Sequence, residues 1–241
     1  MPGPIPVIVC PGLDGSASEF ADLEDLLAPV LEFRFARYPD NDTADVKGLA
    51  SMVASKLRKL PKGKRLLAGC SFGGFVAMQT ALRYPELVDG LCLIATFNHD
   101  PAPISEALGV ALARVLPKST TKTVARVLAR KITGKRMAKS QHKRFADAID
   151  AIDPFVMSAR VRLFQGWDAR ERLTEIAVPV EVVYATRDGI SGTKAQIQGW
   201  AAIPNARVTG VKSGHVLPYA KPKELGKLML DWVQRVTGTA Q

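Results

Sequence analysis

Long hydrophobic runs, cysteines and aromatic residues are all scarce in this sequence of 241 residues. No apolar run approaches the roughly 20 residues needed to cross a bilayer, which excludes a transmembrane segment in these residues. The three cysteines, Cys10, Cys70 and Cys92, cannot all pair with one another, and each lies in or beside an apolar, strand-like segment. We therefore expect buried free thiols and not a disulfide framework.

Aromatic residues make up 7% of the chain, and few of them fall in its most basic segment. Nucleic-acid binding needs side chains that read or stack on bases, so we expect no nucleic-acid partner. The first residues also lack a basic leader, and the apolar run Ile5–Cys10 is short and β-branched, which is more typical of a strand than of a secretory signal. A cytoplasmic location follows as the expectation.

Positive charge is abundant, and it is concentrated in one part of the chain. The formal net charge is +10, and the segment from Pro101 to Leu163 holds thirteen Lys or Arg residues against four acids. The rest of the chain is therefore close to neutral. Such a segment can dock an acidic partner, or its charges can simply solvate the outer face of helices. The sequence leaves both interpretations open.

Strand-like and helix-like segments alternate from the first residues, and the length suits a single α/β domain. The alternation predicts a doubly wound, mostly parallel sheet of about six strands with helices on both faces. The expected strands are 6–10, 32–38, 65–68, 87–96, 178–186 and 206–211. One expected helix ends near residue 31, and three others span 45–60, 73–84 and 222–236.

Between Phe97 and Val178 the strand signals stop and helical periodicity takes over. Three apolar helix faces can be traced there: Leu108, Leu112, Val115 and Leu116; Val124, Val127 and Leu128; and Phe145, Ile149 and Ile152. We therefore predict an all-helical insertion at residues 98–177, within an α/β core formed by residues 1–97 and 178–241.

The segment Gly69-Cys70-Ser71-Phe72-Gly73-Gly74 is a G-x-S-x-G motif that lies directly between a predicted strand and a predicted helix. A serine on such a turn has a strained backbone, so its neighbours must be small, and the glycines meet that need. The following helix directs its N-terminal amides towards the same point, where an oxyanion would form during acyl transfer. The motif predicts Ser71 as a nucleophile. A glycine-rich turn without chemistry is the plainer alternative.

A serine nucleophile needs a histidine base, and the chain has three histidines. His215 follows the last predicted strand, at the sheet edge where ligand crevices form, so it is the preferred base. His99 is interpreted as a loop residue and His142 as a solvated helix residue.

The base in turn needs a buried carboxylate to orient it. Asp188 follows the apolar run 180–186 and precedes a glycine, so it lies at the tip of a predicted strand and is the preferred acid. A turn-forming aspartate is the plainer interpretation of that position. Asp100, just past the preceding strand, is the reserve candidate.

The tetrahedral intermediate of acyl transfer needs two amide donors. The amide of Phe72, directly after the nucleophile, is the first predicted donor. The second is the amide of Leu13, in the turn Pro11–Ser16 after the first strand. Asp14 and Ser16 in that turn can equally cap the following helix.

With these residues placed, the chain resembles the α/β-hydrolase superfamily over nearly its whole length. The resemblance rests on four motifs in the family's order: Pro11-Gly12-Leu13-Asp14-Gly15, Gly69-Cys70-Ser71-Phe72-Gly73-Gly74, Ala185-Thr186-Arg187-Asp188 and Gly214-His215. It implies hydrolysis of an ester or thioester through an acyl-enzyme, without a metal or an organic cofactor. It also implies that the helical insertion is a lid.

The sequence departs from the family pattern in two places. The first strand begins almost at Met1, so we expect no N-terminal antiparallel hairpin, and Pro11 stands where many relatives have a histidine. The serine nucleophile argues against the dehalogenase and epoxide-hydrolase members, which use an aspartate there.

Two classes of function remain. The first is a serine carboxylic-ester or thioester hydrolase whose acyl chain lies under the lid, against residues such as Leu112, Leu116, Phe155 and Phe164. Its basic lid would dock an acidic carrier protein, a CoA thioester or an anionic lipid surface, and a superfamily member that acts on an acyl-carrier-protein ester has a basic lid of this kind. The second class is a ligand-binding protein that keeps the fold without turnover.

Overall fold

The computed structural model describes residues 3–41, 43–101 and 139–238. Six strands form one sheet in the order β2-β1-β3-β4-β5-β6, and every neighbouring pair is parallel. The strands are β1 (Ile5–Cys10), β2 (Leu31–Phe35), β3 (Leu66–Cys70), β4 (Gly90–Ile94), β5 (Val180–Ala185) and β6 (Ala206–Val211). The predicted doubly wound α/β sheet is confirmed.

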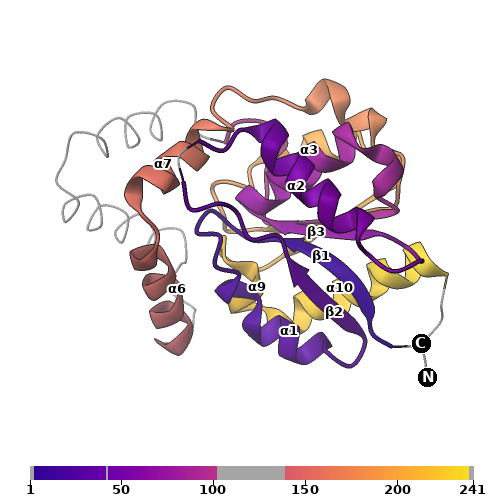
Figure 1. Cartoon of the computed structure of the whole chain (residues 1–241), viewed down its shortest axis with the longest axis horizontal. Helices are drawn as coiled ribbons and strands as arrows, with labels where there is room; N and C mark the ends of the chain where they lie inside the picture. Colours follow the sequence, from indigo (N-terminus) through magenta and orange to yellow (C-terminus); the bar gives the residue numbers. More distant parts are fainter. Residues whose placement is uncertain (1–2, 42, 102–138, 239–241) are drawn as a thin grey trace.

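Helices cover both faces of this sheet (Figure 1). One face carries α1 (Ala21–Leu27), α9 (Leu217–Ala220) and α10 (Pro222–Thr237), and the other carries α2 (Val46–Arg58), α3 (Phe72–Arg83) and α8 (Lys194–Trp200). Three short 3-10 helices, η1 (Ser18–Phe20), η2 (Pro85–Leu87) and η3 (Arg170–Glu175), complete the core. The sequence analysis did not predict α8, because this seven-residue helix is too short to show a clear apolar period.

Alternation along the strands divides the core into two layers. In β1, Val7 and Val9 pack against the α1 and α10 side, whereas Ile8 and Cys10 pack against the α2 and α3 side. A strand of a parallel sheet is buried on both faces, which explains why its sequence is a continuous apolar run. Complete burial of one such aliphatic side chain stabilises the fold by about 1.5–3 kcal/mol.

The three cysteines are buried free thiols, as predicted. Cys10 belongs to the layer under α2 and α3, whereas Cys70 and Cys92 belong to the opposite layer. Within the residues that the structure describes, no helix is both long enough and apolar enough to span a membrane.

The chain between β4 and β5 includes α6 (Lys139–Ala151) and α7 (Pro154–Arg162), which lie together at one side of the molecule in Figure 1. Phe145 of α6 packs edge-on against Tyr219 of α9, with ring centroids 6.2 Å apart. The two apolar faces predicted around Leu112 and Val127 lie outside the described residues. The insertion as a whole therefore stays a prediction.

The strand order places a topological switch point at the carboxyl ends of the strands. From β1 the chain continues to β2 on one side, and β3 pairs with β1 on the other side, so the loops after β1 and β3 diverge. In open α/β sheets, ligands bind at such a switch point, outside the carboxyl ends of the strands. The loops that follow β1, β3, β5 and β6 therefore lie where a ligand site is expected.

Candidate active site

Ser71 forms a turn of one residue between β3 and α3. The strand continues to Cys70 and the helix begins at Phe72, so the turn is tighter than predicted. Ser71 has φ 52° and ψ −120°, a conformation that side-chain-bearing residues rarely adopt. The turn is held because Ser71 N–H donates to the Ile94 carbonyl at 2.9 Å and Thr96 Oγ1 donates to the Ser71 carbonyl at 2.7 Å.

The small residues around the turn are needed for close packing. A Cβ atom on Gly73 would collide with the carbonyl oxygens of Cys10 and Pro11 at the end of β1. A Cβ atom on Gly69 would collide with the Gly73 carbonyl oxygen. Glycine at these two positions therefore lets β1, β3 and the start of α3 approach one another closely.

The structure brings Ser71, His215 and Asp188 together from three different loops. Ser71 Oγ lies 2.7 Å from His215 Nε2, and His215 Nδ1 lies 2.8 Å from Asp188 Oδ2. His215 is buried in the loop between β6 and α9, and Asp188 is buried after β5. Since an ionised carboxylate only accepts, Nδ1 carries the proton and Nε2 accepts from the serine hydroxyl. This is the arrangement that a general base requires.

Asp188 remains ionised although it is buried. Burial opposes its ionisation, but the nearby His215 and hydrogen bonds from His215, Ser191 and Ile190 lower the pKa of Asp188 to about 2. The amides of Ile190 and Ser191 each donate to the carboxylate at 2.9 Å. The Ser191 hydroxyl donates to the same carboxylate. The side chain is therefore a fixed anion directed at the imidazole.

The amides of Leu13 and Phe72, the two predicted oxyanion donors, have no hydrogen-bond acceptor among the described residues. Phe72 is the first residue of α3, where an amide has no partner within the helix. Next to the Leu13 amide, both backbone groups of Gly12 are engaged. The Gly12 amide donates to Glu19 Oε1 at 2.7 Å, and the Gly12 carbonyl accepts from Gly15 N–H at 3.0 Å.

Two charged residues near this loop are buried, which was not predicted from the sequence. Glu19 of η1 is only 8% exposed, and Arg160 of α7 only 3%. Arg160 donates to the Leu13 carbonyl at 2.8 Å and to the Pro39 carbonyl at 3.2 Å, and its guanidinium lies 5.3 Å from the centre of the Tyr38 ring. Charged residues on short helices are normally solvent-exposed, so no local signal marks either of them.

Aromatic side chains pack on the α3 side of the turn. Phe164 is buried and lies 6.3 Å from the Phe72 ring and 4.9 Å from the Phe97 ring, measured between centroids. Phe155, the other described residue expected to line an acyl site, is 45% exposed. Leu112 and Leu116 lie outside the described residues.

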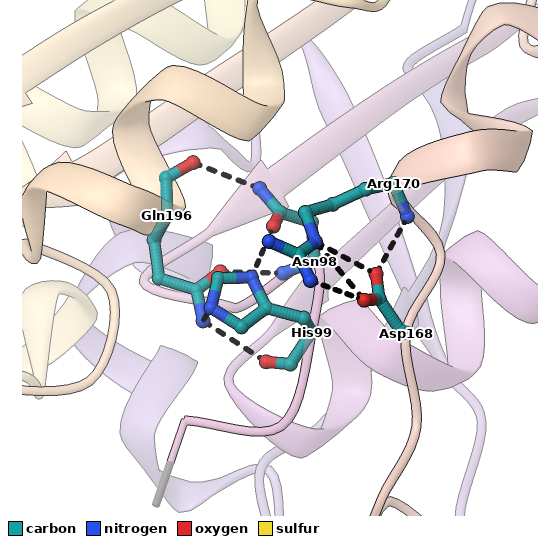
Figure 2. Close-up of polar contacts among 5 residues, drawn as sticks. All are labelled: Asn98, His99, Asp168, Arg170 and Gln196. Atoms are coloured by element: carbon teal, nitrogen blue, oxygen red, sulfur yellow. Dashed lines mark hydrogen bonds and ion pairs between the residues drawn. The ribbon is translucent and has the colours of Figure 1, made fainter.

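The other histidines and the reserve acid lie in different surroundings. Figure 2 shows His99 within a polar cluster after β4, where His99 Nδ1 contacts Asn98 Oδ1 at 2.7 Å and the Gln196 amide donates to the His99 carbonyl at 2.9 Å. Asp168, on the facing segment, pairs with Arg170. Asp100 accepts from the Gly166 amide at 2.7 Å. His142 belongs to α6.

No group of three or more His, Cys, Asp or Glu side chains that could hold a metal ion is found in residues 3–41, 43–101 and 139–238.

Comparison with known sequences matches a family and several curated relatives. The family described as the alpha/beta hydrolase fold matches residues 5–222. The chain is 30% identical over 160 residues to a pimeloyl-[acyl-carrier protein] methyl ester esterase of Pseudoalteromonas atlantica, covering 63% of this chain and 60% of that protein. It is 26% identical over 199 residues to the enzyme of the same name from Shewanella oneidensis, covering 77% of this chain and 74% of that protein.

Comparison with solved structures shows the same fold at lower identity. An enol-lactonase from Burkholderia xenovorans superposes with a TM-score of 0.80 at 17% identity, covering 97% of this chain and 92% of that one. A thermophilic esterase from Thermogutta terrifontis superposes with a TM-score of 0.79 at 19% identity, covering 98% of this chain and 92% of that one. At such identities the likeness concerns the fold alone.

Proposed function

Because this chain belongs to the alpha/beta hydrolase fold family, we propose that it is a serine esterase in which Ser71 is the nucleophile, His215 the base and Asp188 the orienting acid. One observation carries the proposal: an unbroken hydrogen-bond chain runs from Ser71 Oγ through His215 to Asp188. Beside it lie two amides, of Leu13 and Phe72, without acceptors in the described part of the chain. The esterase names of the relatives support the same class of reaction.

Acylation begins when Ser71 Oγ attacks the ester carbonyl carbon and its proton passes to His215 Nε2. The carbonyl oxygen becomes an oxyanion, which accepts hydrogen bonds from the Leu13 and Phe72 amides. The imidazolium formed on His215 is stabilised by the ionised Asp188. When the intermediate collapses, the bond to the alcohol oxygen breaks, and the alcohol leaves with the proton from His215 Nε2.

Deacylation repeats these steps with water in place of the serine. His215 Nε2 takes a proton from the water as its oxygen attacks the acyl carbon, and a second oxyanion forms at the same amides. The bond from the acyl carbon to Ser71 Oγ then breaks, and Oγ recovers the proton from His215. The products are a carboxylic acid and the free enzyme, so no cofactor enters the balance.

The substrate class follows from the relatives and from the charge of the chain. We propose an ester, or a thioester, that is presented on an acidic carrier such as an acyl carrier protein, because the matched relatives are named for such an ester. The excess of Lys and Arg between Pro101 and Leu163 would attract that carrier. Residues 98–177 would then act as the lid over the acyl chain. An anionic lipid surface is the competing partner.

Several basic residues of this segment already have partners within the chain. Arg144 of α6 pairs with Asp22 at 2.7 Å, Lys143 pairs with Asp147 at 2.7 Å, and Arg160 is buried. These basic side chains are therefore less available to a carrier, and those of residues 114–136 lie outside the described residues.

A fluorophosphonate label, which reacts with activated serines, separates an enzyme from a ligand-binding protein with the same fold. The proposal predicts labelling of the native chain, complete loss of labelling in Ser71→Ala, and unchanged labelling in Ser16→Ala, whose serine lies in the neighbouring loop. Labelling that persists in Ser71→Ala would refute the assignment of the nucleophile. A folded native chain that neither labels nor hydrolyses any ester or thioester in a panel of acyl lengths would favour the binding protein.

A further inference from the structure

Glu19 is a buried carboxylate that the proposed mechanism does not use. Its Oε1 accepts from the Gly12 amide at 2.7 Å, and Glu19 and the Cys70 thiol influence each other's pKa. Gly12 directly precedes Leu13, and Cys70 directly precedes Ser71. The carboxylate is thus bonded to the segment that carries the Leu13 amide and lies near the segment that carries Phe72.

The remaining polar groups of the loop Pro11–Ser16 are held from other directions. The Pro11 carbonyl accepts from the Tyr38 hydroxyl at 2.9 Å, so the Pro11–Gly12 peptide is fixed at its oxygen by Tyr38 and at its nitrogen by Glu19. The Leu13 carbonyl accepts from Arg160. The Leu13 amide belongs to the peptide between these two, whose oxygen, the Gly12 carbonyl, accepts from Gly15 N–H at 3.0 Å, so its direction depends on all three anchors.

We propose that Glu19 is a positioning residue for ester hydrolysis: by accepting from the Gly12 amide, it helps to set the direction of the Leu13 amide relative to the Phe72 amide. The inference rests on the proposed function, since it concerns the oxyanion of that reaction. Loss of the carboxylate would leave the buried Gly12 amide without an acceptor, and the loop would turn to pair it. The Leu13 amide would then no longer face the position of the oxyanion.

The surroundings of Glu19 show how positioning can be separated from charge. Burial and the nearby Asp14 raise the pKa of Glu19 to about 7, while the Gly12 amide, His215 and Cys70 oppose that rise. Tyr38 and Tyr219 also interact electrostatically with Glu19. Glutamine has the same shape and keeps an oxygen acceptor for the Gly12 amide, but it carries no charge at any pH. Alanine removes both the acceptor and the charge.

The test compares Glu19→Gln and Glu19→Ala with the native chain on a small neutral ester, p-nitrophenyl butyrate. Removal of one oxyanion donor typically costs about 10²–10³ in kcat, so we expect Glu19→Ala to lower kcat by about 30-fold or more while KM changes by less than about twofold. Glu19→Gln should keep kcat within about threefold of the native value. Glu181→Gln is the matched control, because Glu181 is also buried but pairs with Arg235 near the start of β5.

A trifluoromethyl ketone inhibitor supplies a readout that a loss of stability alone would not change. It adds to the serine as a tetrahedral oxyanion, so its affinity reports on the oxyanion donors. We expect its inhibition constant to weaken in Glu19→Ala by the same factor as kcat/KM, and to stay unchanged in Glu181→Gln. Thermal unfolding followed by circular dichroism confirms that each variant is folded.

Glu19→Asp covers the case in which the alanine variant does not fold. Aspartate is one methylene shorter, so it should hold the Gly12 amide poorly, and kcat and inhibitor affinity should both fall by about tenfold. Unchanged kcat in a folded Glu19→Ala or Glu19→Asp would overturn the proposal, and so would a loss of kcat without a matching loss of inhibitor affinity. Turnover that persists in Ser71→Ala would instead refute the proposed function, whatever Glu19 does.

Discussion

Two buried carboxylates lie near His215, and their ionisation differs because their hydrogen-bond donors differ. Asp188 receives the imidazole N–H, two amides and a hydroxyl, so despite burial its pKa is about 2. Glu19 receives one amide, so burial and the nearby Asp14 raise its pKa to about 7. Only Asp188 is therefore a permanent anion at neutral pH, which suits it to stabilise an imidazolium.

Asp188→Asn should lower kcat by about three to four orders of magnitude, because an amide does not hold Nδ1–H as a carboxylate does and leaves the base in the wrong tautomer. Hydrolysis of p-nitrophenyl butyrate at pH 8 measures the loss. Asp100→Asn is the matched control, since Asp100 follows the neighbouring strand and bonds the Gly166 amide. If Asp100→Asn were the inactive variant and Asp188→Asn the active one, the orienting acid would have been assigned to the wrong residue.

Glu19 should also make the stability of the fold depend on pH. Its pKa is about 7 when folded and near the ordinary 4.5 when unfolded. Below pH 4.5 both states hold the proton and Glu19 costs no stability; as pH rises from 4.5 to 7 the unfolded chain ionises first, and stability is lost. The loss reaches about 3 kcal/mol above pH 7.

Urea unfolding of the native chain and of Glu19→Gln, at pH 5 and at pH 8, measures this loss. The variant lacks the titrating group, so its free energy of unfolding should fall by about 2.5 kcal/mol less than that of the native chain between the two pH values, because part of the loss has already occurred at pH 5. Equal changes in both proteins would show that Glu19 is ionised in the fold well below pH 7.

At the scale of elements, buried amide side chains join β4 to α8. Asn98 lies in the segment that follows β4. Its backbone N–H donates to Gln196 Oε1 at 2.7 Å, and its side-chain amide donates to the Gln196 carbonyl at 2.8 Å. The Asn98 carbonyl accepts from the Ala169 amide at 2.9 Å. Figure 2 shows how these residues bring the segment after β4, the segment before η3 and α8 to one place.

Gln196→Leu should destabilise the fold by about 2–4 kcal/mol, because it leaves the buried Asn98 N–H without an acceptor. Gln198→Leu, on the exposed side of the same helix, should change stability by less than about 0.5 kcal/mol. Thermal and urea unfolding of the two variants measure the difference. Similar stabilities for both would mean that water replaces Gln196 at no cost.

The fold was predictable from the sequence because most buried parallel strands are short apolar runs and the longer helices show a period. Ser71, His215 and Asp188 were predictable as candidates because each follows the end of such a run, and the ends of parallel strands meet at one edge of a sheet. Glu19 was not predictable, because its burial depends on how the turn with Gly12 folds back over η1, which no local pattern shows. Arg160 is a similar case, since its partners lie in two loops that precede it by more than 100 residues.

Over the whole molecule, the charge distribution separates the two classes of substrate that the site could take. The residues outside Pro101 to Leu163 are nearly neutral in sum, so a small uncharged ester should approach the site without electrostatic steering. An acidic carrier should be attracted through the basic segment, and salt screens such attraction over about 8–10 Å at physiological ionic strength. Salt and charge reversal therefore test the carrier without changing the catalytic residues.

We predict that kcat/KM for an acyl-carrier-protein-linked ester falls by about tenfold when ionic strength rises from about 0.05 M to about 0.5 M, whereas kcat/KM for p-nitrophenyl butyrate stays within about twofold. Arg126→Glu, in the basic segment, should lower only the carrier-linked value, because it reverses one attractive charge. Lys62→Glu is the matched control, since Lys62 is exposed in the loop before β3, whereas Ser71 follows the other end of this strand. If neither salt nor Arg126→Glu changed kcat/KM for either substrate, the basic residues would only solvate the surface. Attraction between a carrier and these charges must weaken when the charges are screened or reversed.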